Sequence, residues 1–452
     1  MGQTDSSQGV HSQTECAERP APSRVQSFST TRVAFFLCPV VFFLSYCFTR
    51  NPDFAWIYQH LGAEYYNVAR ALADGRGFSD PFGEPTGPTA WMPPVFPAII
   101  ALCLSIFETR SAATTAIISL TNVALVVIGV VIYSVCRRAA TWLSPLVAVV
   151  FYLLWISVFN FSFFRFTHDV WLIALLVAMM CLAVSRLMSS QAVPVLAWGV
   201  LAGGATLVSP AVAAAWCALS AYLFWRAKAQ RRQWLLAGAI ALSIATPWTV
   251  RNALVFERFI PAKSNAGFEL YLANVAYPSG IYDTRALISH PHNDPVLRFQ
   301  YAQLSEGTYI ALHQREFFTA LKARPLDYLR RVANRLLAVT VRLPEYGINP
   351  GLRGHVVRSI LHVLPLLVLI CSVRVRGPNH RFIALLAIFW CLYLTPYILV
   401  AFYMRYWLPL TPLLVIIFFL GLDQLAGSQS ERLRNSRLWL EGWLFPDSPP
   451  TT

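Results

Sequence analysis

Long apolar segments separated by short polar ones occupy most of the chain from residue 31 to residue 422. Most of these segments have close to the roughly 17 to 25 residues that a helix needs to cross a membrane. The pattern predicts ten membrane-spanning helices, at residues 31–48, 112–136, 142–159, 170–188, 193–208, 211–225, 234–250, 357–373, 382–403 and 406–422. The fold class that follows is an all-α integral membrane protein.

An eleventh apolar stretch, residues 95–107, is short and follows Pro93-Pro94. Charge decides whether it crosses, because basic residues gather in the loops on the cytoplasmic side of a membrane. If it does not cross, all the basic loops lie on the side of the N-terminal tail, namely those at 137–138, 186, 226–232 and 374–381. We therefore expect this stretch to lie in the interface or to re-enter. Both termini are then cytoplasmic, and residues 50–108 and 251–355 form two large extracytoplasmic loops with interfacial helices.

The composition agrees with a membrane protein. Of the 452 residues, 56% are hydrophobic and 13% are charged, and the mean hydropathy is +0.51, whereas soluble domains have roughly 25% charged residues. The net charge of +14 comes from short basic clusters between apolar segments, so nucleic-acid binding is not indicated. The nine cysteines form no CxxC pair, and neither a zinc site nor a disulfide framework is indicated.

The two ends of the chain differ from the middle. Residues 1–30 are rich in Ser, Gln, Pro and Thr and lack the apolar stretch of a signal peptide, so we expect a disordered cytoplasmic tail there. Residues 423–452 are expected to form a cytoplasmic C-terminal tail. Residues 31–422 then make up one polytopic membrane domain.

The first external loop, residues 50–108, has the features of a catalytic loop. Glu64 lies in a short helical run that Gly75 and Gly77 are expected to end, and a polar loop leads from there to Pro93-Pro94. Glycine supplies the positive φ that a helix end commonly requires, and proline stiffens the return to the membrane. An acid held beside a membrane in this way suits catalysis, although the pattern also fits a solvated residue of an amphipathic helix.

The second external loop, about a hundred residues long, is too long for an idle connection. We expect it to pack over residues 62–97 as a lid that orders partly when substrate binds. After a polar turn at 290–295, residues 304–337 predict one or two helices with a break before Pro325. His290 and His292 with Asp294 form only a weak metal-binding pattern. No P-loop or GxGxxG is present, so nucleotide hydrolysis is not supported.

Seven motifs in a fixed order, together with their common external placement, resemble the C-type superfamily of polytopic glycosyltransferases. That superfamily includes the protein O-mannosyltransferases and the aminoarabinose transferase of lipid A. The motifs are Gly62-Ala63-Glu64, Ala69-x5-Gly75-x-Gly77-Phe78, Gly87-Pro88-Thr89-Ala90-Trp91-x-Pro93-Pro94-x-x-Pro97, His168-Asp169, Pro247-Trp248-x-x-Arg251-Asn252, Glu269-Leu270-Tyr271-x-x-Asn274 and Arg405-Tyr406-x-x-Pro409. The resemblance covers nearly the whole chain after residue 31.

The resemblance implies a sugar donor carried on a polyprenyl or dolichyl phosphate, and an acid in the first external loop that acts on the acceptor. Glu64 lies where that acid is expected and where many relatives have Asp. A carboxylate within about 3 Å of an acceptor hydroxyl or amine turns it into a good nucleophile by taking its proton. Asp169 follows His168 and opens a span, and it is the second catalytic candidate. The helix macrodipole, worth roughly 0.3–1 kcal/mol, explains a carboxylate there equally well.

The donor phosphate needs cations at the external ends of the spans. Arg405, Arg251 and Lys263 lie at such ends, and arginine matches phosphate oxygens with two parallel hydrogen bonds. Interfacial anchoring is the alternative for Arg405, because tyrosines flank it. No DxD motif points to a metal, so no metal ligand is predicted, and the resemblance leaves a divalent cation open.

Other residues of the motifs are expected to line the substrate pocket. Trp91 is expected either to stack on a sugar ring or to sit in the aromatic belt at the membrane surface. The expected pocket residues are Tyr66, Trp91, His168, Glu269, Asn274 and Tyr406.

These features predict a hexosyl- or pentosyltransferase in the bacterial inner membrane. It would move a sugar from polyprenyl phosphate to a lipid, glycan or protein acceptor on the extracytoplasmic face. A ligase or polymerase of lipid-linked surface polysaccharide would also use external arginines and a base. A transporter places its ionisable residues at mid-membrane, whereas these spans are nearly free of charge. Convergence of Glu64 and Asp169 at the membrane edge would favour the enzyme.

Reporter tags test the predicted topology. A tag ahead of residue 30 should report the cytoplasm and a tag within 280–300 the external side, because the basic loops lie on the side of the tail. A tag in the 226–232 loop is the control and should agree with the N-terminal tag. If the N-terminal tag and the tag within 280–300 report the same side, the ten-span topology is wrong.

Overall fold

The computed structural model describes residues 28–50, 63–107, 109–164, 168–189, 195–226, 228–277, 279–282, 286–341, 351–375 and 377–444. Within these ranges the regular elements are helices, and β-structure is limited to two isolated bridges, Ser79 with Pro88 and Ile281 with Phe402. The predicted all-α membrane class is therefore confirmed. Gly62 and the outer parts of both predicted tails, residues 1–27 and 445–452, lie outside the described residues.

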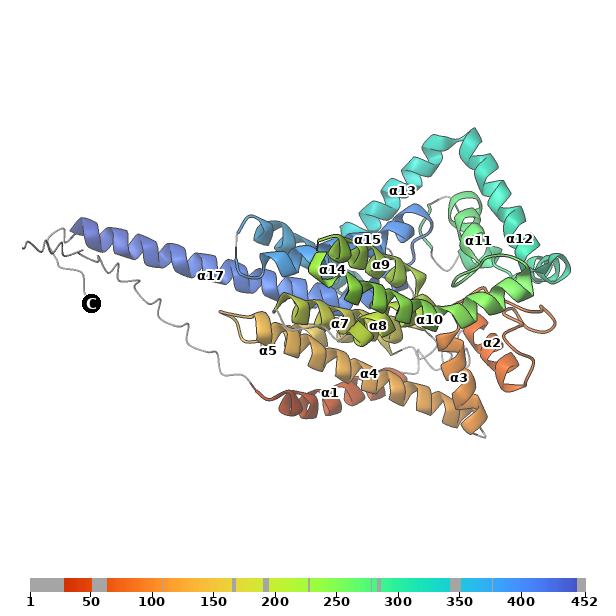
Figure 1. Ribbon diagram of the computed structural model, residues 1–452, viewed down its shortest axis with the longest axis horizontal. Coiled ribbons are helices and arrows are strands. Elements are labelled where there is room, and N and C mark those ends of the chain that lie inside the picture. Colours follow the sequence, from red (N-terminus) through yellow and green to blue (C-terminus); the bar gives the residue numbers. More distant parts are fainter. Residues whose placement is uncertain are drawn as a thin grey trace, which may run out of the picture.

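Each predicted span corresponds to a helix of the structure. Most of these helices run along the long dimension of the molecule, and α17 continues beyond the bundle at one end (Figure 1). They are α1 (Thr30–Arg50), α4 (Arg110–Ala139), α5 (Leu146–Val158), α7 (Val170–Met188), α8 (Val195–Val208), α9 (Pro210–Arg226), α10 (Arg231–Phe256), α14 (Gly351–Val373), α15 (His380–Leu399) and α17 (Thr411–Leu444).

Seven helical segments among the described residues are long and apolar enough to cross a membrane: α1, α4, α7, α10, α14, α15 and Met404–Gln429, which includes the short helix α16 (Met404–Trp407) and the first part of α17. These segments establish a multi-pass membrane protein. The helices α5, α8 and α9 are shorter, with 13, 14 and 17 residues, so the count of ten spans stays a prediction. At 12 residues, α3 (Val95–Ile106) is below the usual length of a span, which suits the expected interfacial or re-entrant position.

α17 forms the centre of the bundle. Its residues from Leu413 to Leu420 are buried, and it packs against α4, α5, α7, α14 and α15. The carboxylate of Asp423 ties this helix to the turn between α4 and α5, because it accepts the backbone N–H groups of Trp142 and Leu143, each at 2.7 Å. A buried carboxylate satisfied by backbone donors in this way stabilises the end of the bundle.

α10 lies at the edge of the bundle and contacts α8 closely. Much of its surface is exposed, including Leu235 and Leu242, as lipid-facing positions would be. A Cβ atom built on Gly199 would lie 2.7 Å from the carbonyl oxygen of Ala237, and one on Gly203 would lie 2.7 Å from the Cβ of Ile244. The four-residue spacing of these glycines is typical of helices whose backbones approach closely in a membrane.

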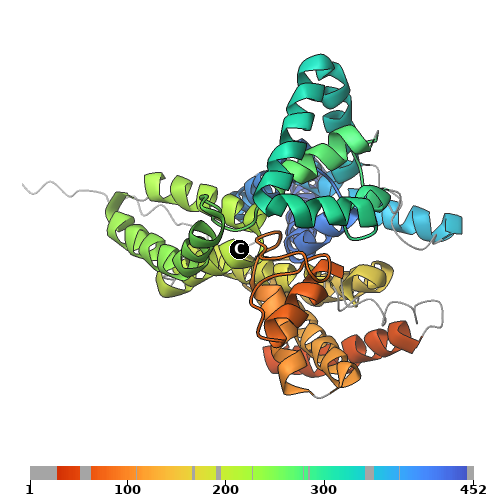
Figure 2. The same cartoon turned by 90° about the vertical axis from the view of Figure 1, so that its right-hand side faces the viewer.

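Several connections between the spans, the two longest included, gather at the other end of the bundle. They contain α2 (Ala63–Ala73), α11 (Ala266–Tyr271) with a π-turn at Leu272–Ala276, α12 (Pro295–Ala323), α13 (Pro325–Thr340) and α16 (Met404–Trp407). Figure 2, which looks onto this end, shows the loop that follows α2 beside the green and teal segments of the second external loop. α6 (Asn160–Phe163) is a single turn before α7.

The predicted break before Pro325 is confirmed, since α12 ends at Ala323 and α13 begins at Pro325. α12 starts earlier than predicted, at Pro295, because Asp294 caps it by accepting the backbone N–H of Val296 at 2.8 Å. Proline at the first helical position suits this start. The predicted start of this helix rested on its apolar positions, and the capping carboxylate lies before the first of them.

Several predicted span ends are displaced, and the largest displacement is in α17, which continues from residue 422 to Leu444. α10 continues past residue 250 to Phe256, where Glu257 takes the left-handed conformation with φ 53° that commonly ends a helix. α15 ends at Leu399 instead of residue 403. The buried guanidinium of Arg335 donates to the carbonyl oxygens of Ile398 at 2.6 Å and Leu399 at 3.2 Å, so a side chain from α13 satisfies the last turn of α15.

α13 has the surface expected of an interfacial helix. Leu326, Leu329, Leu336 and Leu337 are exposed on it, and the exposed Arg330 lies on the same helix. Exposed leucine beside arginine is typical of helices that lie in the surface of a membrane. The interfacial position of α13 stays a prediction.

The two large loops that are predicted to be external are joined by the carboxylate of Glu306, which is 3% exposed. Ser305, with φ 63°, kinks α12 just before it. Oε1 of Glu306 accepts the backbone N–H of Ala90 at 2.8 Å and the hydroxyl of Ser264 at 2.7 Å, while Oε2 accepts the hydroxyls of Thr89 and Tyr301. The expected packing of the second loop on the first is therefore present, and its ordering on substrate binding stays a prediction.

We expect Glu306→Gln to destabilise the external part of the protein. The amide has one acceptor oxygen instead of two and turns an NH2 group toward hydroxyl and backbone donors. Loss of hydrogen bonds to a buried charge costs roughly 1.5–3 kcal/mol, or roughly 3–12 °C in the midpoint of thermal unfolding. Glu316→Gln, at an exposed acid of the same helix, is the control and should leave the midpoint unchanged. Equal midpoints for Glu306→Gln and wild type would contradict this role of Glu306.

Candidate active site

Six ionisable side chains from separate parts of the chain are linked by electrostatic interactions, chiefly through Lys263, His290 and Arg405. They meet where α7 begins and where the short helix α16 leads toward α17, at the end of the bundle that carries the large loops. The six are Glu64 in α2, Asp169 before α7, Lys263 between α10 and α11, Glu269 in α11, His290 before α12 and Arg405 in α16. Five of them were predicted as site residues, and the structure brings those five together.

Glu64 lies in the first turn of α2, and its side chain is 23% exposed. Its Oε1 atom lies 3.4 Å from Nε2 of His290. Lys263 is also near enough to feel its charge. A carboxylate that is partly exposed and oriented by neighbours suits proton removal from a bound group.

Asp169 occupies the N-cap position of α7 but makes no side-chain capping hydrogen bond. Its Oδ2 atom instead accepts the hydroxyl of Tyr65 at 2.9 Å. Burial, followed by the charge of Asp169, holds the pKa of Tyr65 well above its usual value, so the phenol keeps its proton and acts as the donor. Capping therefore does not explain the direction of this carboxylate, although the macrodipole still favours its charge.

Arg405 lies over the rings of Tyr403 and Tyr406, with its Cζ atom 5.3 Å from each ring centroid. The negative charge of Asp169 acts on it. Its Nε atom is buried and has no hydrogen-bond partner among the described residues. A buried donor without a partner is costly, and it is therefore a natural contact for an anionic ligand.

Lys263 faces the same group of acids. Burial lowers the pKa of Lys263, and the nearby Glu269 partly offsets that effect. Glu269 is itself held in place, because it accepts the hydroxyl of Tyr282 at 2.7 Å and the side-chain amide of Asn265 at 3.1 Å. Glu269 therefore compensates the cationic side of the site.

Arg251 is turned toward the first external loop. Its Nη1 atom donates to the carbonyl oxygen of Thr89 at 2.7 Å, and its Nη2 atom donates to that of Phe78 at 2.9 Å. These bonds hold the two sides of the loop together. The observed contacts of Arg251 stabilise the shape of the first external loop. Phosphate binding by Arg251 stays a prediction.

The pocket residues predicted from the motifs are spread over several environments. Tyr66 carries Arg110 over its ring at 4.9 Å, on a different face of α2 from Tyr65. Trp91 is 3% exposed and makes edge-to-face contacts with Phe82 and Tyr301. Trp91 therefore lies in the core of the external loops, and neither sugar stacking nor a place in the aromatic belt explains its contacts.

Three further predicted pocket residues are packed against the bundle. His168 is buried before Asp169. Asn274 donates to the carbonyl oxygen of Val400 at 3.1 Å and accepts Nη1 of Arg335 at 3.1 Å, so it joins the second external loop to the end of α15. The ring of Tyr406 stacks on that of Tyr397, with centroids 4.6 Å apart, beside Arg405.

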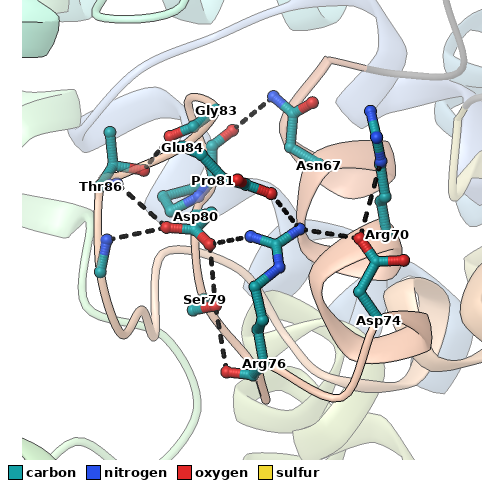
Figure 3. Close-up of polar contacts among 11 residues, drawn as sticks. Asn67, Arg70, Asp74, Arg76, Ser79, Asp80, Pro81, Gly83, Glu84 and Thr86 are labelled. Atoms are coloured by element: carbon teal, nitrogen blue, oxygen red, sulfur yellow. Dashed lines mark hydrogen bonds and ion pairs between the residues drawn. The ribbon is translucent and has the colours of Figure 1, made fainter.

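The loop after α2 is held by a network around Arg76 and Asp80 (Figure 3). The carboxylate of Asp80 accepts the backbone N–H groups of Thr86 and Gly87, each at 3.0 Å, and also pairs with Arg76. Gly75 and Gly77 have φ values of 77° and 78°, which confirms that these glycines take the conformation expected at the end of α2. The network fixes the path of the chain from α2 to Trp91, and none of its acids is one of the ionisable residues of the candidate site.

The residues of the weak metal-binding pattern at 290–294 make other contacts in the structure. Asp294 caps α12, and His290 is directed toward Glu64. Among the described residues, no group of three or more His, Cys, Asp or Glu side chains is arranged to hold a metal ion. The question of a divalent cation stays open.

Two residues of the site were not predicted for it. Tyr65 adjoins the predicted Tyr66, and the helical rotation of about 100° per residue decides which of them faces Asp169. His290 was considered only as a metal ligand. Because successive residues of α2 point in different directions, only one of the two tyrosines can face Asp169. Which of them does so depends on how α2 is placed relative to α7, and that is set by tertiary packing.

Comparison with known proteins adds one family. Residues 92–250 match the family model of dolichyl-phosphate-mannose-protein mannosyltransferase. The matched stretch includes Asp169 and Val250, begins after Glu64 and ends before Lys263. A search of curated proteins gives no match. The family match supports the resemblance to the C-type superfamily, and a membrane glycosyltransferase of that type is the function class to which it points.

Proposed function

We propose that the protein transfers a hexose or pentose from a polyprenyl phosphate to a lipid, glycan or protein acceptor. The reaction takes place on the extracytoplasmic face of the bacterial inner membrane. The observation that carries this proposal is the convergence of Glu64 and Asp169 with Arg405 and Lys263 at the ends of apolar helices. A donor with a lipid tail has its phosphate at this depth, so the acids and the cations meet it where its sugar begins.

Glu64 acts as the general base in this proposal. Its carboxylate takes the proton of the acceptor hydroxyl or amine as that atom bonds to the anomeric carbon of the sugar. The bond between the anomeric carbon and the phosphate oxygen breaks, and its electron pair leaves with the lipid phosphate. The proton rests on Glu64, and the products are the glycosylated acceptor and the polyprenyl phosphate.

Arg405 and Lys263 bind the donor phosphate. The buried Nε–H group of Arg405 has no partner among the described residues, and a phosphate oxygen would satisfy it. Both cations stabilise the charge that grows on the phosphate as the sugar leaves, and such charge is stabilised strongly in a partly buried site. Glu269 keeps Lys263 in place and limits the excess positive charge when the donor is absent.

Asp169 and Tyr65 position the cationic side of the site. The hydroxyl of Tyr65 donates to Asp169, and the negative charge of Asp169 acts on Arg405. In the proposal, this pair orients Arg405 toward the donor. Positioning of this kind is a large part of the rate enhancement of transfer reactions.

The helix-end position of these groups counts against a transporter, whose ionisable residues lie at mid-membrane. A ligase of lipid-linked polysaccharide would use the same base and cations. The two enzymes differ in the donor, because a ligase takes a preformed glycan chain and the proposed transferase takes a single sugar. Supplying the purified protein with each donor type separates them.

We expect Glu64→Gln to lower the rate of sugar transfer roughly 10²–10⁴-fold, because general base catalysis is lost. Donor binding and the midpoint of thermal unfolding should not change, since the amide keeps the size of the side chain. The assay uses purified protein in lipid with polyprenyl-phosphate sugars. Glu316→Gln is the control, because Glu316 pairs with His313 much as Glu64 pairs with His290, but away from the site.

The control variant should transfer sugar at the wild-type rate. If Glu64→Gln also transfers sugar at that rate, Glu64 is not the base. If both variants are slow, the loss belongs to the fold of the external loops and not to the chemistry.

A further inference from the structure

The turn that carries His290 is rigidly built. The carbonyl oxygen of His290 accepts the backbone N–H groups of Asn293 at 2.9 Å and Asp294 at 3.0 Å. Arg298, one turn into α12, donates to the carbonyl oxygens of Pro291 at 3.2 Å and His292 at 2.7 Å. The position of the imidazole is thus set by the backbone and by the start of α12.

The hydrogen bonds of the turn fix the tautomer of His290. The backbone N–H of His292 donates to Nδ1 of His290 at 3.2 Å, so Nδ1 is the acceptor nitrogen. A neutral imidazole then carries its proton on Nε2. That Nε2–H group lies 3.4 Å from Oε1 of Glu64, a separation that commonly closes to a hydrogen bond when an active site is occupied.

The surroundings keep the imidazole neutral. Its side chain is 9% exposed, and the rings of Phe82, Trp91 and Phe268 stand edge-to-face around it. Burial lowers the pKa of His290, while the charges of Glu64 and Glu269 oppose that effect and Arg405 adds to it. A neutral ring with Nδ1 already occupied cannot take a proton from Glu64, so it acts as a donor and not as a proton relay.

We propose that His290 is a positioning residue for the general base. Its Nε2–H holds Oε1 of Glu64 and leaves Oε2 to take the proton of the acceptor. None of the described residues donates a hydrogen bond to Oε2. The inference rests on the proposed function of Glu64 and adds the side chain that orients it.

Two substitutions at His290 separate the role of its Nε2–H group from the role of the rest of the imidazole. The amide of His290→Asn lies near the position of Nδ1, so this variant can keep the bond to His292 but cannot reach Glu64. The longer His290→Gln places an amide N–H near the position of Nε2. His313→Asn is the matched control, because His313 lies in the same aromatic core, against Phe268 and Tyr309, and pairs with Glu316 at 3.0 Å.

We expect His290→Asn to lower kcat roughly 10- to 100-fold with little change in KM, which corresponds to a lost hydrogen bond to a charged group. A hydrogen-bond donor favours the charged form of a carboxylate, and loss of the donor disfavours it. The acid limb of the profile of kcat/KM against pH should move to higher pH. His290→Gln should keep most of the activity, and His313→Asn should match wild type in kcat and in its pH profile.

A double substitution separates this inference from the proposed function. If His290 acts through Glu64, then His290→Asn should cost nothing further in a protein that already carries Glu64→Gln. Additive losses, or a His290→Asn variant with wild-type kcat and pH profile, would overturn the role of His290 while Glu64 stays the base. Full activity of Glu64→Gln alone would instead overturn the proposed function.

Discussion

The carboxylate of Glu306 joins the two external loops, and the geometry of the candidate site depends on that junction. Through Thr89 and Ala90 it holds the loop that follows α2, and through Ser264 it holds the segment that carries Lys263. Its own helix, α12, begins at the turn that presents His290. One buried side chain therefore fixes three of the segments that meet at the site, and four donors offset the cost of burying its charge.

Charge balance at the membrane edge is the second constraint. Three acids and two basic side chains, Lys263 and Arg405, lie close together beside apolar helices, where water screens them poorly. Glu269 compensates Lys263, Asp169 compensates Arg405, and Glu64 faces the neutral imidazole of His290. Of the three acids, Glu64 has the smallest effect on Lys263, so its charge is the least committed to a cation of the group, which fits the role of a base in the proposed mechanism.

The sequence predicted the features that depend on local pattern. Apolar length located the helices, glycine located the end of α2, and Pro325 located the break between α12 and α13. The predicted common external side of Glu64 and Asp169 allowed them to meet and left open whether they do. These features follow from rules that act within a few residues or from the sidedness that charge gives to a membrane protein.

The contacts that complete the site depend on packing across the chain, and the sequence alone did not specify them. Tyr65 reaches Asp169 over 104 positions, and Glu306 reaches Thr89 over 217. No periodicity in 304–337 distinguishes Glu306 from a solvated acid, because the kink at Ser305 redirects it. Arg251 fits a phosphate-binding pattern in the sequence but is occupied by the carbonyl oxygens of Phe78 and Thr89.

The central claim is that this site removes a sugar from a lipid phosphate. Mass spectrometry of lipid-linked sugars and envelope glycans, in cells with and without the protein, tests it most directly. The account predicts that cells without the protein accumulate one polyprenyl-phosphate sugar and lose that sugar from a lipid, glycan or protein product. Unchanged levels of both the lipid-linked sugars and the envelope products would contradict it.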